Sequence, residues 1–98
     1  MASSIGNSGR FLSGEKTVTA TGTAEALGTG LYKAVSIIAK AANTNQVYVG
    51  GSDVATTTND GLDANDSLNL SDGRGLNLAD IYIDVDTNGE GVDFYATR

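Results

Sequence analysis

One run of oxygen-bearing side chains in this chain has a spacing that could bind a metal ion. Asp84, Asp86 and Asn88 alternate along the chain and Gly89 occupies the sixth position, as at the start of a calcium-binding loop. Such a loop requires a bidentate glutamate at its twelfth position, which here is Tyr95. Asn-Gly between two alternating runs is also a strong hairpin signal. We therefore expect these residues to shape a turn, and we expect no metal site.

A second group of carboxylates recurs at every third position in a stretch without regular apolar periodicity. Asp60, Asp63 and Asp66 could gather a cation weakly if the loop brought them together. Carboxylates in loops are most often solvated rather than bound to an ion. We expect the same here.

The composition removes the usual parts of an enzyme. There is no histidine and no cysteine, so the commonest general base and all thiolate chemistry are absent. A carboxylate pair could serve a glycosidase, but that reaction needs a cleft the size of a sugar, and a small polar domain gives no sign of one. We expect a protein that is not an enzyme and uses no cofactor.

The formal net charge is −6, and the charges are distributed unevenly. The half up to Val49 carries four basic and two acidic residues, whereas the remainder carries two basic and ten acidic ones. An acidic chain without a basic stripe argues against nucleic-acid binding. The asymmetry indicates either a solvated acidic surface or a less acidic half that docks on a partner. No apolar stretch approaches the ~20 residues of a membrane span, and the N-terminus lacks the apolar core of a signal peptide.

The segment from Leu31 to Gly51 is the centre of the predicted fold. Leu31–Ala39 fits both helical and strand spacing, but Val35, Ile37 and Ile38 are β-branched and favour a strand. A polar turn at Asn43–Asn45 then leads into Val47–Val49, which ends in two glycines. We therefore predict a two-stranded unit at the centre of a β-sandwich.

Short alternating runs separated by turn signals continue along the chain and are typical of a sandwich or jelly roll. The predicted strands are Thr17–Thr21, Ala24–Leu27, Ser67–Leu70, Leu76–Leu78, Asp80–Val85 and Val92–Ala96, with turns at Ser71–Gly75 and Thr87–Gly91. The predicted fold is all-β: one antiparallel β-sandwich or jelly-roll-like domain of about seven to eight short strands over residues 17–98. The expected core is Leu27, Val35, Ile37, Val47, Val49, Leu68, Ile81, Ile83, Val92 and Phe94.

The N-terminal residues 1–16 are predicted to form a flexible arm. Its first fourteen residues are rich in glycine, serine and asparagine and contain one bulky apolar pair, Phe11-Leu12, after Arg10. Such a segment is either a disordered leader or an arm that becomes ordered on a neighbouring subunit. In the second case Phe11 and Leu12 are the expected anchors, and Arg10 the expected charge contact.

The sequence resembles small β-sandwich virion proteins of tailed bacteriophages, which include capsid decoration (cement) proteins. The resemblance rests on the runs Gly22–Ala24, Val35–Ala39, Asn43-Thr44, Val47–Gly50 and Asp80–Ile83. These motifs are structural rather than catalytic. The segment Leu62–Ser67 lacks the Pro-Gly pair that such modules often carry before the fifth strand.

The resemblance implies a structural virion protein that decorates a capsid and clamps neighbouring major capsid subunits. The expected partners are the major capsid protein and further copies of this chain, as a trimer or dimer, with neither nucleic acid nor membrane involved. The expected location is the capsid surface, after synthesis in the host cytoplasm. Two alternatives remain open: a glycan-binding host-recognition module of a head or tail fibre, and a head–tail connector component.

Overall fold

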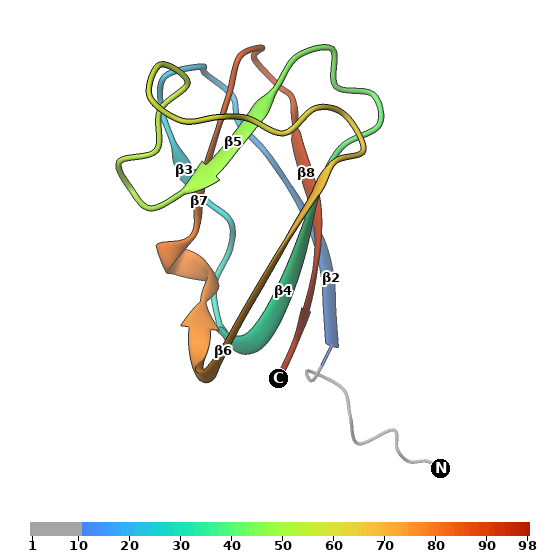
Figure 1. Ribbon diagram of the computed structural model, residues 1–98, viewed down its shortest axis with the longest axis vertical. Helices are drawn as coiled ribbons and strands as arrows, with labels where there is room; N and C mark the ends of the chain where they lie inside the picture. Colours follow the sequence, from blue (N-terminus) through green and yellow to red (C-terminus); the bar gives the residue numbers. More distant parts are fainter. Residues whose placement is uncertain (1–10) are drawn as a thin grey trace.

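The computed structural model describes residues 11–98, which form two antiparallel β-sheets (Figure 1). The larger sheet has the strand order β2-β8-β4-β6, with β2 at Phe11–Thr17, β8 at Gly91–Thr97, β4 at Leu31–Ala39 and β6 at Ser67–Asn77. The smaller sheet has the order β3-β7-β5, with β3 at Glu25–Ala26, β7 at Tyr82–Val85 and β5 at Val47–Gly50. A single 3₁₀ turn, η1 (Leu78–Asp80), precedes β7. The predicted all-β sandwich is confirmed.

Strand β4 lies inside the larger sheet, where it pairs with β6 on one side and β8 on the other. Val35, Ile37 and Ala39 alternate with half-buried residues, and all three are buried in the core. The β-branched side chains of Val35 and Ile37 suit this pleated, fully paired position. The strand prediction for Leu31–Ala39 is therefore confirmed, and the helical alternative is excluded.

Two predicted pairings of neighbouring strands are wrong, because the chain changes sheets at both turns. The turn at Asn43–Asn45 connects β4 in the larger sheet to β5 in the smaller one, so these strands do not pair. Asn88-Gly89 likewise links β7 to β8 across the sandwich and is not a hairpin turn. Gly89 has a φ of 86° and donates its N–H to the carbonyl of Val18 at 2.7 Å. The turn signals were real, but local sequence does not specify whether a turn stays within one sheet.

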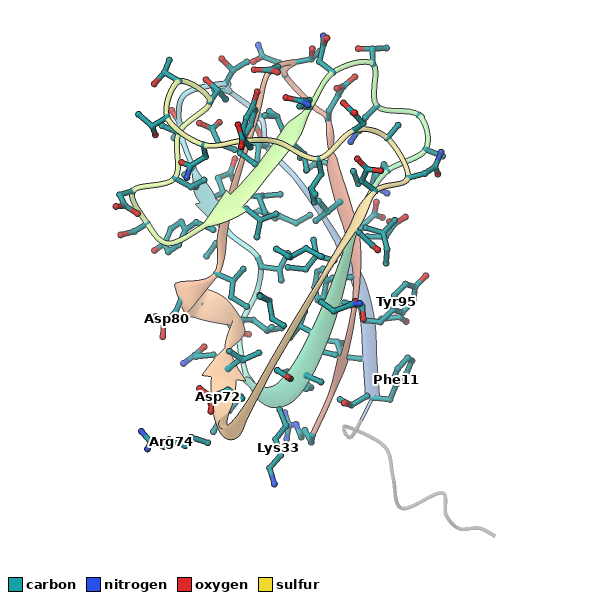
Figure 2. The ribbon with its side chains drawn as sticks, viewed as in Figure 1. Phe11, Lys33, Asp72, Arg74, Asp80 and Tyr95 are labelled. Carbon is teal, nitrogen blue, oxygen red and sulfur yellow. The ribbon has the colours of Figure 1, made fainter. Side chains whose placement is uncertain are left out.

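The predicted turn at Ser71–Gly75 is a bulge within one long strand, β6. The register with β4 jumps from Ser71 opposite Ala34 to Leu76 opposite Tyr32, so four residues of β6 face Lys33 alone. Gly75 supplies the φ of 107° that the bulge needs. Figure 2 shows Lys33, Asp72 and Arg74 projecting near this bulge, at the bottom of the view.

The predicted boundary between arm and sandwich at Thr17 is also wrong. Strand β2 pairs with β8 from Phe11 opposite Thr97 to Thr17 opposite Gly91, so the sandwich includes residues 11–16. The predicted strand at Thr17–Thr21 is instead the end of β2 followed by a connection to β3. The alternation in that run was misleading, because only Val18 in it is buried.

The core between the sheets agrees closely with the prediction. The predicted core residues that are buried are Leu27, Val35, Ile37, Val47, Ile81, Ile83, Val92 and Phe94. Val49 and Leu68 are only half-buried. Sequence patterns missed Val18, Tyr32, Tyr48 and Leu78, which are buried as well. Leu78 belongs to η1, where the period-two alternation does not apply.

The outer faces of the two sheets differ in their surroundings. On the smaller sheet, Tyr48 and Asp84 are paired across β5 and β7, and both are buried. Asp84 Oδ1 accepts the Gly22 N–H at 3.0 Å, so the connection after β2 lies against this side chain. Gly61 approaches Tyr48 from another loop, since a Cβ on Gly61 would lie 2.9 Å from Cε2 of the Tyr48 ring. The outer face of the larger sheet, by contrast, carries exposed side chains on β2, β6 and β8.

Candidate docking surface

The outward-pointing residues of the larger sheet form what we call the outer sheet face. Alternation places the core residues Val92, Phe94 and Ala96 inward, so their neighbours on β8 point outward. The strand registers align the outward residues of the other strands with these. The outer sheet face comprises Phe11, Ser13 and Glu15 of β2, Asp93, Tyr95 and Thr97 of β8, Ala34, Ser36 and Ile38 of β4, and Ser67, Asn69 and Ser71 of β6.

Two aromatic rings stand together on this face. Phe11 is 60% exposed and Tyr95 is 44% exposed, and with Leu31 they are the large hydrophobic residues exposed in the described part of the chain. Their ring centroids are 6.2 Å apart and their planes differ by 18°, a stacked arrangement. Figure 2 shows both side chains projecting from the β2 and β8 side of the sheet. Small residues lie beside them, with Ser36 opposite Tyr95 and Ala34 opposite Thr97.

Gly14 allows β2 to pass close over the core below this pair. A Cβ at Gly14 would lie 2.6 Å from Phe94 Cζ, so close that the Phe94 ring or the strand would have to shift. Glycine therefore lets the Phe94 ring fill the inward position beneath β2, while Ser13 and Glu15 on either side point outward. The same residue that made the N-terminal stretch resemble a flexible linker thus permits its close packing.

An ion-pair cluster lies on the same face, next to the aromatic pair. Lys40 Nζ is 2.7 Å from Glu15 Oε1 and 2.8 Å from Asp93 Oδ1. Hydrogen bonds to Asp93 and Glu15 raise the pKa of Lys40 above its ordinary value. The cluster has two carboxylates for one ammonium group and therefore carries a net negative charge.

A shallow hollow lies between Tyr95 and the ion-pair cluster. Its lining residues are Ser13, Gly14, Glu15, Lys40, Asp93 and Tyr95. Tyr95 provides an aromatic wall, the ion-pair cluster provides a charged wall, and Ser13 contributes a hydroxyl group. Such an arrangement can bind a group that has both a flat surface and hydrogen-bond donors.

The structure separates the predicted anchor residues of the arm. Phe11 points outward on β2, but Leu12 is half-buried and packs against the core, because successive residues of a strand face opposite sides. Phe11 and Leu12 therefore cannot act together as an apolar anchor, and that prediction is corrected. Arg10 lies outside the described residues. No local sequence pattern indicated Tyr95, because its partner Phe11 is distant in the chain.

The first three side chains considered for metal binding, Asp84, Asp86 and Asn88, accept hydrogen bonds from protein groups. Asp84 Oδ1 accepts from the Gly22 and Val85 N–H groups, and Asn88 Oδ1 accepts from the Thr21 N–H at 2.8 Å. The hydroxyl of Tyr48 donates to Asp86 Oδ2 at 2.9 Å, and burial together with this bond raises the pKa of Tyr48. These three residues connect separate loops at one end of the sandwich.

The second group of carboxylates has comparable local partners. Asp63 Oδ1 accepts from Gln46 Nε2 at 3.0 Å, and Asp66 Oδ2 accepts from the Asp63 N–H at 3.1 Å. Within residues 11–98, no three acidic side chains are grouped so that they could hold a metal ion.

The part of the chain that the structure describes contains no helix long and apolar enough to cross a membrane.

Comparisons with known proteins identify no relatives of this chain. No protein-family model, curated protein or solved structure matches the chain.

Proposed function

We propose that this protein decorates a tailed-bacteriophage capsid and stabilises it by clamping neighbouring major capsid subunits. The observation that carries the proposal is the stacked pair Phe11 and Tyr95, exposed on a sheet face whose other residues are polar apart from the half-buried Ala34 and Ile38. Aromatic residues are enriched at protein interfaces and depleted from surfaces that face only water. The resemblance of the sequence to virion accessory proteins supplies the identity of the partner.

The position of the aromatic pair agrees with a role for the N-terminal residues. Phe11 is both the first residue of β2 and part of the outer sheet face, so residues 1–10 join the sandwich at the edge of this face. A partner bound to the outer sheet face therefore lies next to Phe11, the residue that directly follows Arg10 in the chain. In this proposal Arg10 makes a charge contact with the capsid, and Phe11 contributes apolar area.

The small size of the domain suits repeated attachment to a lattice. Each copy offers one modest surface, and linked contacts on a lattice raise the effective affinity by orders of magnitude. In this proposal the copies associate as trimers or dimers on the virion, and light scattering of the free protein at increasing concentration tests that association. The contacts are made by binding alone, without chemistry on a substrate.

The proposal is tested by adding the purified protein to capsids of its own phage that lack it. The expected result is saturation at a copy number set by the capsid lattice, with a rise in the temperature at which the capsid disrupts. A copy number that fits only a connector ring or tail tip would overturn capsid decoration. Cryo-electron microscopy of the same particles shows where the added density lies.

One alternative is favoured by the same surface. Exposed aromatic rings beside carboxylates and hydroxyl groups also bind sugars, so the outer sheet face is compatible with a glycan-binding module of a head or tail fibre. Binding to host cells or their isolated surface glycans, lost in a Tyr95→Thr variant, would support this alternative. Saturable binding to capsids without glycan binding would support decoration.

A further inference from the structure

The hollow beside Tyr95 has a composition that selects for one kind of side chain. Two of its lining residues, Glu15 and Asp93, are carboxylates, and Lys40 offsets only one of their charges. The net charge of the hollow favours a cationic group over an anionic or neutral one. Because each ion pair to Lys40 uses one named carboxylate oxygen, each carboxylate retains a second oxygen as a hydrogen-bond acceptor.

The exposures of these side chains show which groups an incoming partner meets. The side chain of Glu15 is 67% exposed and that of Asp93 is 43% exposed, whereas that of Lys40 is 26% exposed. The carboxylates are thus more accessible than the ammonium group that joins them. The ammonium also restrains both carboxylates, which lowers the conformational entropy lost when a second cation binds them.

The aromatic wall of the hollow favours an arginine side chain of the partner over a lysine side chain. Phe11 stacks against Tyr95, and Tyr95 is 44% exposed and lines the hollow. A guanidinium group is planar, weakly hydrated and able to stack on an aromatic ring while it donates hydrogen bonds to carboxylates. A lysine ammonium is compact and strongly hydrated, and it gains less from a ring at its side.

We propose that the hollow on the outer sheet face receives an arginine side chain of a protein partner. The guanidinium group packs against the Tyr95 ring and donates hydrogen bonds to Glu15 and Asp93. This inference deepens the proposed function and rests on it, since the partner that presents the arginine is then the major capsid protein. The capsid assay alone does not show whether this arginine contact forms.

The test uses the full-length protein and small probes, with amide chemical shifts as the readout. The protein is titrated with N-acetyl-arginine amide, and the matched probe is N-acetyl-citrulline amide, a neutral near-isostere, at the same ionic strength. N-acetyl-lysine amide controls for charge alone. The arginine probe is expected to shift the amides of Ser13, Gly14 and Tyr95, with a dissociation constant on the order of 10 mM, because exposed ion-pair and cation–π contacts are individually weak.

Three variants locate the binding site and separate its two walls. Glu15→Gln and Asp93→Asn each remove one negative charge, and Tyr95→Leu removes the ring but keeps an apolar side chain. Each variant should bind the arginine probe at least about threefold more weakly, if each contact contributes as exposed pairs usually do. The dispersion of the amide spectrum shows that each variant is folded. Leu31→Thr, at an exposed apolar residue that does not line the hollow, should leave binding unchanged.

The outcomes separate this inference from the proposed function. Equal shifts with the citrulline probe, or arginine binding that survives Glu15→Gln and Tyr95→Leu, would overturn the arginine site. Shifts at the same amides by simple sugars but not by arginine would overturn it in favour of a glycan. Capsid binding without arginine binding would overturn only the arginine site, whereas arginine binding by a protein that does not bind capsids would overturn only decoration.

Discussion

The ring of Phe94 lies directly beneath Gly14, so close that a Cβ on the glycine would stand 2.6 Å from Phe94 Cζ. This contact joins the first strand of the sandwich to the last one, since Gly14 is paired with Phe94 across β2 and β8. It also places the outward residues Ser13 and Tyr95 opposite each other. The candidate docking surface therefore depends on an inward contact on the other side of the same strands.

We predict that Gly14→Ala destabilises the protein by about 1–3 kcal/mol, the usual cost of adding a methyl group where there is no room. Urea unfolding at neutral pH measures the change. Gly73→Ala is the matched control, because a Cβ there would meet nothing within 4 Å and no positive φ is required. A Gly14→Ala variant as stable as the Gly73→Ala variant would show that β2 does not pack as described.

The inward and outward faces of β4 can be compared at two neighbouring isoleucines. Ile37 is fully buried, and Ile38 is half-buried on the outer sheet face. Ile37→Ala should cost roughly 2–5 kcal/mol, enough to unfold a marginal domain, whereas Ile38→Ala should cost clearly less. Thermal or denaturant unfolding of both variants gives the comparison. Equal costs, or a larger cost at Ile38, would mean that the facing of β4 is reversed.

Stability should fall on acidification, partly through Glu90. Its carboxylate accepts hydrogen bonds from the Thr44 N–H, the Thr44 hydroxyl and the Asn45 N–H, and these bonds lower the pKa of Glu90. A carboxyl group with a lowered pKa in the folded state stabilises the fold above its unfolded pKa of about 4.3. That stabilisation is lost as the pH falls through the folded value.

The Glu90→Gln variant separates this effect from general acid unfolding. Its melting temperature should lie below that of the wild type at neutral pH, and the difference should shrink below about pH 4 as Glu90 becomes protonated. Glu25, whose pKa is lowered by its hydrogen bond to Lys16, contributes in the same direction and is unchanged in this variant. A difference that is constant with pH would contradict the role given to the Glu90 charge.

Calcium should have no effect on stability. Asp84 and Asn88 accept backbone N–H groups of the connection after β2, and Asp86 accepts the Tyr48 hydroxyl, so their hydrogen bonds are made within the protein. The melting temperature should be the same in chelator and in millimolar calcium. A rise that depends on calcium concentration would show that a site forms at these residues after all.

Patterns of β-branched and apolar residues predicted the strands and most of the core, because burial imposes alternation along each strand. Val35, Ile37, Ile81 and Ile83 were assigned inward on that basis, and all four are buried. The pairing of strands was not predictable in the same way. Whether β5 joins the sheet of β4 depends on contacts with distant segments, such as β7, and not on the turn between them.

The candidate site could be predicted only in part. Phe11 stood out in the sequence as a bulky residue among glycine and serine, but its partner Tyr95 lies near the other end of the chain. The glycine that suggested a flexible arm is required by the Phe94 ring, a contact between strands that no local pattern reveals. Asp84 was expected to shape a turn, but it lies in β7 and is buried, because the connection around Gly22 covers it.

Capsid binding by variants of the aromatic pair shows whether the outer sheet face attaches this protein to a capsid. A variant with Phe11→Thr and Tyr95→Thr keeps residues that favour strands at both positions and removes the aromatic pair. Leu31→Thr is the control, since it changes another exposed apolar residue at the start of β4. All three proteins, including the wild type, are added to undecorated capsids at equal concentration, after folding of each has been verified.

We predict that the wild type and the Leu31→Thr variant saturate the capsids and raise their thermal stability, whereas the double variant leaves most sites empty. The expected loss follows from the large share of binding energy that buried aromatic residues carry at interfaces. Full occupancy by the double variant, with the capsids as stable as with the wild type, would show that the aromatic pair on the outer sheet face does not attach the protein to the capsid.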